Sequence, residues 1–242
     1  MARRKRRYVA LGDSMSISEY PNMDAASRYG RHFNDLGAAA LLFRNNDELF
    51  PEFAGRDLES RREGFEFVDL ATDGAILPTV MSQLGGMGDS PEIITLTVGG
   101  NDMLGVVWSA ASATNRIAAA IEHIADSYEA LVFRIRATAP EALLILNTVY
   151  DPSDGTGRLP GTNERLPIEH LPIFNDRVRA VAEATHGAVL ADVHSHFLGH
   201  GITAPAGSRW YWAETIIEPG ITGASEIRRL WVDALDRTGA KP

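Results

Sequence analysis

The stretch "IITLTVGGND", residues 93–102, is a short apolar run that ends in two glycines and a polar pair. Residues 93–98 are apolar or β-branched throughout and do not alternate with polar residues. A strand that is buried on both faces has this composition, which is typical of parallel sheets. We therefore expect a central strand of a parallel sheet here, with its carboxyl end at the glycines.

Four other short runs have a similar length and are mostly apolar. They are "YVAL" at residues 8–11, "FEFVDL" at 65–70, "ALLILN" at 142–147 and "AVLADV" at 188–193. Segments with helical spacing separate most of them. Strand and helix in repeated alternation predict an α/β protein with one parallel five-stranded sheet, helices on both faces and right-handed crossovers.

Three helices are expected from apolar spacing and end signals. Residues 114–138 carry apolar side chains at three- and four-residue steps. Residues 173–187 repeat the pattern and end at Gly187, a typical residue after a helix. The last helix is expected to have Ser225 as its N-cap. Three segments that are long or rich in Pro and Gly are interpreted as surface insertions: residues 20–58, 151–171 and 199–213.

The composition is that of a globular protein with an acidic balance. Of the 242 residues, 45% are hydrophobic and 23% are charged, and the formal net charge is −9. This balance argues against a nucleic-acid partner, which would require a basic face. Because the chain has no cysteine, disulfides and thiolate catalysis are excluded.

The basic run "RRKRR" is the one cluster of positive charge along the chain. Residues 1–7 are interpreted as a solvated basic tail and residues 8–242 as a single domain. No apolar run approaches the roughly 20 residues that span a bilayer, and no signal-peptide pattern follows the basic start. We expect a cytoplasmic protein; the sequence does not give its oligomeric state.

Residues with different chemical roles follow the first three predicted strands. Ser14 offers a nucleophilic hydroxyl, and the amide N–H groups of Ser14 and Gly74 and the side-chain amide of Asn101 offer hydrogen-bond donors. Each alone is ordinary turn chemistry. At one sheet edge, however, they would supply the nucleophile and the oxyanion hole of an acyl transfer. That chemistry needs no metal and no cofactor, and its partner would be a small-molecule ester.

These residues lie in motifs that resemble the blocks of the SGNH or GDSL hydrolase family. The first block matches "GDS", with Met15 in place of the usual leucine, the second matches "DGA" around Gly74, and the third, G-x-N-D, is matched in full at residues 99–102. The resemblance runs from Tyr8 to Ala240. It implies a three-layer α/β/α fold of flavodoxin-like type and ester hydrolysis through an acyl-serine on Ser14, with Ser14, Gly74 and Asn101 forming the oxyanion hole.

The fourth block departs from the family, which reads D-x-x-H-P before the last helix. The chain has "TIIEP" there, so that Thr215 stands at the aspartate position and Glu218 at the histidine position. A carboxylate with a pKa near 4 is a poor base for a serine unless burial raises that pKa. The general base is therefore expected elsewhere in the chain.

Three histidines lie just upstream in "DVHSHFLGHG", after the fifth predicted strand. We favour His200 as the base, since it lies between two glycines in an irregular stretch, followed by His194 and then His196, with Glu218 as the acid that orients the imidazole. Histidines in a loop also cap carbonyls, and together with Asp192 they have the spacing of a metal site. The metal alternative is the weaker of these.

Three functions remain open from the sequence. The first is a serine esterase or acyl hydrolase that acts on a small ester, such as an O-acetylated carbohydrate or a short acyl ester. The second is a catalytically silent, hydrolase-like binding protein that has lost its fourth block. The third is acyl transfer to an acceptor other than water. The sequence does not identify the acyl chain or the alcohol.

Overall fold

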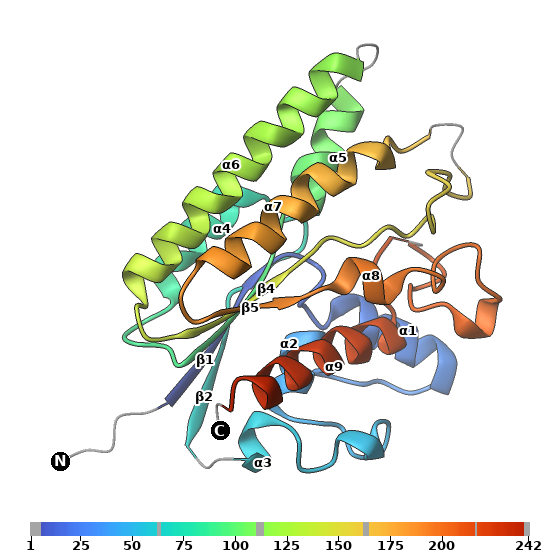
Figure 1. The fold of residues 1–242 in the computed structure, drawn as a ribbon. Helices are drawn as coiled ribbons and strands as arrows, with labels where there is room; N and C mark the ends of the chain where they lie inside the picture. Colours follow the sequence, from blue (N-terminus) through green and yellow to red (C-terminus); the bar gives the residue numbers. More distant parts are fainter. Residues whose placement is uncertain (1–5, 62–63, 110–113, 162–164, 216, 240–242) are drawn as a thin grey trace.

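A computed structural model describes residues 6–61, 64–109, 114–161, 165–215 and 217–239. Its centre is a sheet of five parallel strands in the order β2-β1-β3-β4-β5. The strands are β1 (Arg6–Gly12), β2 (Phe65–Asp69), β3 (Ile93–Thr97), β4 (Leu143–Asn147) and β5 (Ala188–Ala191). This order and the helices on both faces confirm the predicted three-layer α/β/α, flavodoxin-like fold (Figure 1).

One face of the sheet is covered by helices from the middle of the chain. They are α4 (Leu77–Gln83), α5 (Gly100–Ser109), α6 (Thr114–Thr138) and α7 (Leu171–Ala184). Helix α6 has the bounds that its apolar spacing predicts, and its Tyr128 ring meets the Phe174 ring of α7 edge to face at 5.3 Å. Both rings are buried in the core on this face.

The other face is covered by α1 (Glu19–Tyr29), α2 (Ala38–Phe43) and α9 (Ile221–Arg237). The interpretation of residues 20–58 as a surface insertion is therefore wrong. Residues Ala38 to Leu42 are buried, and all but Ala40 belong to the core on this face, where α2 packs against α9. Glycine and polar residues around α2 gave the segment a loop-like composition, although its run "AAALLF" covers the sheet.

Two helix ends also differ from their predicted places. Helix α9 begins at Ile221 with Gly220 as its N-cap, and Ser225 is buried inside the helix, where its hydroxyl accepts a hydrogen bond from Arg228. Helix α7 ends at Ala184, three residues before Gly187. Ser225 is of a residue type that often caps helices, but here its hydroxyl is the hydrogen-bond partner of the buried Arg228.

Strand β1 begins two residues earlier than its apolar run because charged partners surround its start. Arg6 pairs with Glu92 at 3.4 Å, and Arg7 pairs with Glu66 of β2 at 3.0 Å. The shorter helical elements are η1 (Pro51–Phe53), α3 (Leu58–Arg61), η2 (Leu84–Gly86), η3 (Ile168–His170), α8 (Val193–Phe197) and η4 (Ala206–Ser208).

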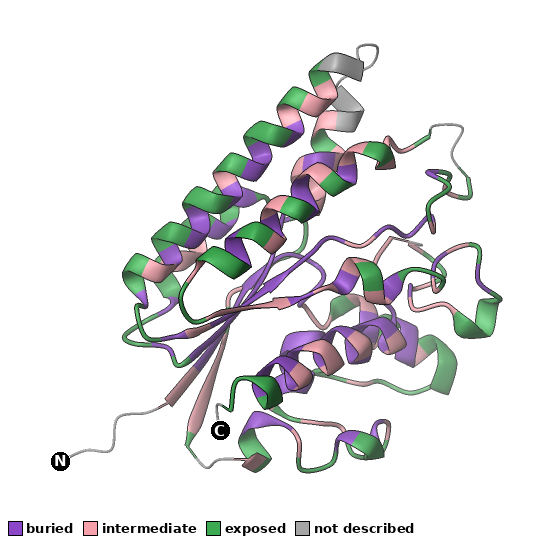
Figure 2. Cartoon of the chain, in the orientation of Figure 1, coloured by how far each residue is buried: buried purple, intermediate pink, exposed green. Residues whose placement is uncertain are grey.

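Burial follows the layers, with the central strands and the inner sides of the helices shielded from solvent (Figure 2). Outward-facing positions of α6 and α7 are exposed, as the helical period of their sequences predicts. In the described part of the chain, no helix combines the length and the apolar character that crossing a membrane requires.

Candidate active site

The first and third motifs lie on neighbouring strands, on either side of the point where the strand order reverses. In the parallel register of β1 and β3, Gly12 pairs with Thr97, so the loops that follow both strands leave the same edge of the sheet. Ligands of doubly wound folds bind at the carboxyl edge near this reversal. Ser14 lies in the turn after β1, and Asn101 lies in the first turn of α5, shortly after β3.

The turn that carries Ser14 is held by close contact with the end of β3. Gly12 has φ +139°, and a Cβ there would overlap the Thr97 carbonyl. The Asp13 amide donates to that carbonyl at 3.0 Å, and the Asp13 carboxylate accepts from the Met15 amide at 3.1 Å. Ser14 itself is 7% exposed. These contacts fix the serine at the floor of a recess.

The second and third motifs contact each other beside this turn. The Asn101 side-chain amide donates to the Ala75 carbonyl at 3.1 Å, and the Asp102 carboxylate accepts from the Leu77 amide at 3.1 Å. The Thr72 amide donates to the Gly12 carbonyl at 3.0 Å. Gly74 lies in the loop between these contacts, exposed and with φ +67°. The structure thus brings Ser14, Asn101 and the Gly74 loop together.

A pocket of about 840 Å³, part of it open to solvent, lies against this edge. Ser14, Asn101 and Glu218 line it together with Asp13 and Tyr150. Most of its wall is apolar and comes from α5, α6, the segment after β4 and the start of α7, through Met103, Leu104, Ile121, Val149, Ile168 and Leu171. Among the described residues, no Lys, Arg or His lines it.

Glu218 lines the same pocket as the serine. Burial raises the pKa of Glu218 to about 7; hydrogen bonding from Ser14 opposes this rise, and the charges of Asp13, Asp73 and Glu19 add to it. One oxygen, Oε2, is buried, and no described residue forms a hydrogen bond with it. Burial likewise raises the pKa of Asp13 to about 6.

The backbone around Glu218 is fixed from two sides. The Glu218 carbonyl accepts from the Trp212 amide at 2.9 Å, and the Gly220 amide donates to the Trp210 carbonyl at 2.9 Å. From the segment after β4, the Tyr150 hydroxyl donates to the Ile217 carbonyl at 2.7 Å. Sequence reasoning missed Tyr150, although its place shortly after a strand end was a signal. These contacts direct Glu218 into the pocket.

His200 and His196 have partners outside the pocket. The His200 ring stacks on Trp210 with centroids 3.6 Å apart, and its Nδ1 lies 3.0 Å from the Ser208 carbonyl. His196 Nε2 lies 2.8 Å from the Glu226 carboxylate. The structure therefore does not bring either imidazole to Ser14.

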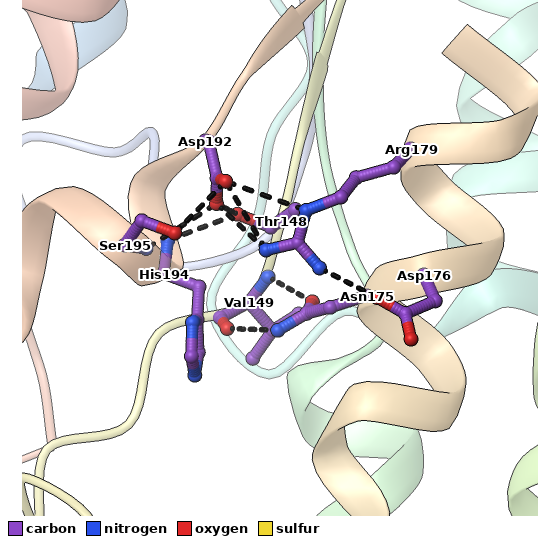
Figure 3. Close-up of polar contacts among 8 residues, drawn as sticks. All are labelled: Thr148, Val149, Asn175, Asp176, Arg179, Asp192, His194 and Ser195. Atoms are coloured by element: carbon purple, nitrogen blue, oxygen red, sulfur yellow. Dashed lines mark hydrogen bonds and ion pairs between the residues drawn. The ribbon is translucent and has the colours of Figure 1, made fainter. Parts of the chain in front are cut away.

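His194 lies beside a polar network at the ends of β4 and β5 (Figure 3). Asp192 pairs with Arg179 at 3.1 Å and accepts hydrogen bonds from Thr148 and Ser195, and the His194 ring points away from this carboxylate. Burial lowers the pKa of His194. In the part of the chain that the structure describes, no group of three or more His, Asp or Glu side chains is arranged to hold a metal ion.

Asn175 of α7 extends this network to the pocket wall. Its buried side chain accepts from the Val149 amide at 2.8 Å and donates to the Val149 carbonyl at 2.9 Å (Figure 3). Val149 lines the pocket. The polar cluster that contains His194 therefore lies behind the pocket wall and supports it.

Comparisons with solved structures show the same fold in ester-cleaving proteins. An extracellular lipase from Streptomyces rimosus is 21% identical with a TM-score of 0.58, with 95% of this chain and 98% of that chain covered. A phospholipase A1 from Streptomyces albidoflavus is 22% identical with a TM-score of 0.56 and the same coverage of 95% and 98%. A catalytic mutant of an acetylxylan esterase from Geobacillus stearothermophilus is 14% identical with a TM-score of 0.62, covering 97% and 94%.

A search of curated proteins found no match to the chain. The model of the GDSL-like lipase/acylhydrolase family matches residues 10–211, which is most of the chain and includes the first three motifs. The match ends before Glu218, the position at which the fourth motif departs from the family pattern. The chain belongs to the GDSL-like lipase/acylhydrolase family.

Proposed function

We propose that the protein hydrolyses carboxylic esters through an acyl-serine intermediate on Ser14. Membership of the GDSL-like lipase/acylhydrolase family supports an ester hydrolase. The observation that carries the proposal is the shared pocket, in which Ser14, Asn101 and the Glu218 carboxylate lie against an apolar wall. Nucleophilic catalysis requires such a serine beside a proton acceptor.

The oxyanion hole is proposed to consist of the Ser14 amide, the Gly74 amide and the Asn101 side-chain amide. Asn101 is supported by its contact with Ala75, which places its amide beside the Gly74 loop at the pocket edge. Donors fixed in this way stabilise the tetrahedral intermediate without reorganising during the reaction.

The acyl group is proposed to be an uncharged aliphatic chain. The wall is apolar, and among the described residues no cation lines it that would attract a carboxylate or phosphate. This favours a short or medium acyl ester over an O-acetylated carbohydrate, whose acetyl group would leave most of the wall uncovered.

Fluorophosphonate labelling of the purified protein tests the proposal, with mass spectrometry to locate the adduct. We expect a stoichiometric adduct on Ser14 and hydrolysis of p-nitrophenyl butyrate, both lost in Ser14→Ala. Ser82→Ala removes an exposed hydroxyl on α4 and should change neither. Product analysis with an added alcohol separates hydrolysis from acyl transfer.

A binding protein is the second candidate, because Glu218 occupies the position of the family histidine. In that case Ser14 would not react with the fluorophosphonate. The apolar pocket would still bind the free acid or the uncleaved ester, which calorimetric titration would detect.

A further inference from the structure

We propose that Glu218 is the general base for Ser14, so that the reaction uses a serine–glutamate pair where the family uses serine and histidine. The inference rests on the proposed function and concerns the residue that takes the serine proton. It replaces the expected role of Glu218 as the acid that orients a histidine.

Geometry supports this assignment first. Glu218 and Ser14 line the same pocket, and hydrogen bonding from Ser14 acts on the Glu218 carboxylate. All seven histidines lie in the described part of the chain, and none of them lines that pocket. His170 comes nearest in sequence, between the wall residues Ile168 and Leu171, but it is not part of the wall.

The second departure from the family motif fits the same assignment. A histidine base needs an acid that fixes its tautomer and stabilises the imidazolium. The position of that acid holds Thr215, whose hydroxyl is buried and has no hydrogen-bond partner among the residues that the structure describes. A carboxylate base has no tautomer to fix and becomes neutral when it is protonated. Glutamate at one position therefore makes the loss of aspartate at the other tolerable.

The proton balance of both half-reactions closes on Glu218. The Glu218 carboxylate takes the Ser14 proton while the serine oxygen bonds to the ester carbonyl carbon. The protonated Glu218 then gives the proton to the departing alkoxide as the carbon–oxygen bond breaks. In the second half, water gives a proton to Glu218 and attacks the acyl-serine, and the proton finally returns to the Ser14 oxygen as the acid leaves.

The charge balance suits an apolar pocket. With a histidine base, proton transfer creates a new imidazolium beside a new oxyanion, a separation of charge that an orienting carboxylate must offset. With Glu218, one negative charge moves from the carboxylate to the oxyanion oxygen of the substrate. The N–H groups of Ser14 and Asn101 then stabilise a negative charge that the site already carried.

The groups that face Glu218 keep it a usable base near neutral pH. The acidic neighbours are Asp13 from the serine turn, Glu19 from α1 and Asp73 from the second motif, with Asp151 in the same pocket, while the tyrosines Tyr20 and Tyr150 interact with it electrostatically. Burial and the three acidic neighbours that act on it raise the pKa of Glu218 to about 7, close to that of imidazole. A base of that strength suits catalysis at neutral pH.

The test compares fluorophosphonate labelling and p-nitrophenyl butyrate hydrolysis from pH 5 to 9 in the native protein and in Glu218→Gln. We expect the native rate to rise with pH to a plateau, with a midpoint near pH 7. Glu218→Gln should lower the rate by about 10²- to 10⁴-fold and abolish this rise. Glu214→Gln alters an exposed glutamate of the same segment and should keep the native profile.

Rescue by a small carboxylate gives a readout that a structural role would not move. Added formate should raise the reaction rate of Glu218→Ala at least tenfold, and it should have no effect on the rate of the native protein. If Glu218→Ala does not fold, the isosteric Glu218→Gln and its pH profile decide the question alone.

The outcomes separate this inference from the proposed function. If native Ser14 reacts and Glu218→Gln keeps the native rate, the inference is overturned while the esterase stands. If His170→Ala, His194→Ala, His196→Ala or His200→Ala abolishes labelling and Glu218→Gln does not, that histidine is the base. If native Ser14 does not react at all, both proposals fail together.

Discussion

Gly12 is the residue on which the position of the serine depends. Its backbone has φ +139° and passes close to Thr97. A Cβ at Gly12 would overlap the Thr97 carbonyl, which accepts a hydrogen bond from the Asp13 amide. We expect Gly12→Ala to lower the free energy of unfolding by about 2–4 kcal/mol and to slow labelling of Ser14. Urea denaturation measures the first effect. Gly85→Ala, where a Cβ meets no atom within 4 Å, should cost far less.

Asn101 is expected to act in the transition state more than in the fold. Its side chain donates a hydrogen bond to the Ala75 carbonyl at the pocket edge. We expect Asn101→Ala to lower kcat by about 10²- to 10³-fold with little change in KM, as for the loss of one oxyanion donor. Steady-state kinetics measure both constants. An unchanged kcat would remove Asn101 from the proposed oxyanion hole; the exposed Asn34→Ala serves as the control.

Glu218 is also expected to lower the free energy of unfolding at high pH. Because burial raises its pKa to about 7, the folded state keeps a proton that the unfolded chain releases near pH 4.5. The stabilising contribution is therefore complete below pH 4.5 and is lost as pH rises through 7. At pH 8 the free energy of unfolding of Glu218→Gln should exceed that of the native protein by on the order of 1 kcal/mol. At pH 4 the two proteins should be equal, and a constant difference would contradict the raised pKa.

At the scale of helices and strands, local pattern predicted some elements well. The apolar run of β3 and the spacing of α6 depend on neighbours in sequence, and their predicted places match within one residue. Helix α2 depends on tertiary contact, since its short run is helical because it packs between the sheet and α9. Such an element has too few residues to reveal a period.

The site shows the same division between local and tertiary information. Strand ends predicted that Ser14 and Asn101 would meet, because neighbouring parallel strands end at one edge. The path of residues 199–213 could not be predicted in this way. His200 stacks on Trp210, and the segment from Trp210 to Trp212 then pairs with the backbone around Glu218. His200, which was expected to reach Ser14, instead packs against the segment that holds the backbone around Glu218.

The burial of α2 can be tested by one truncation. Leu42 is fully buried in the core against which α9 packs, so Leu42→Ala should lower the free energy of unfolding by about 2–4 kcal/mol. Leu198→Ala removes a side chain that is 44% exposed and should cost well under 1 kcal/mol. Equal effects in thermal or urea unfolding would show that residues 38–43 do not form part of the core.

The whole molecule contributes to the pocket, because segments far apart in the sequence form its wall. Helix α5 brings Met103, α6 brings Ile121, and the segment before α7 brings Ile168. No single stretch of sequence encodes this cavity, and its apolar character appears only when these elements pack together. The length of the acyl chain that the enzyme accepts should therefore depend on residues remote from the motifs.

Ile168 offers the cleanest test of this dependence, since it lines the pocket from η3 and is only partly buried. A tryptophan there would fill part of the cavity without displacing a fully buried side chain. We expect Ile168→Trp to lower kcat/KM for p-nitrophenyl octanoate by tenfold or more relative to p-nitrophenyl acetate, because each methylene that leaves the wall loses about 0.8 kcal/mol. Leu198→Trp, outside the pocket, should keep the native ratio. If both esters slow equally in Ile168→Trp, the substitution disturbs the serine itself, and the acyl chain lies elsewhere.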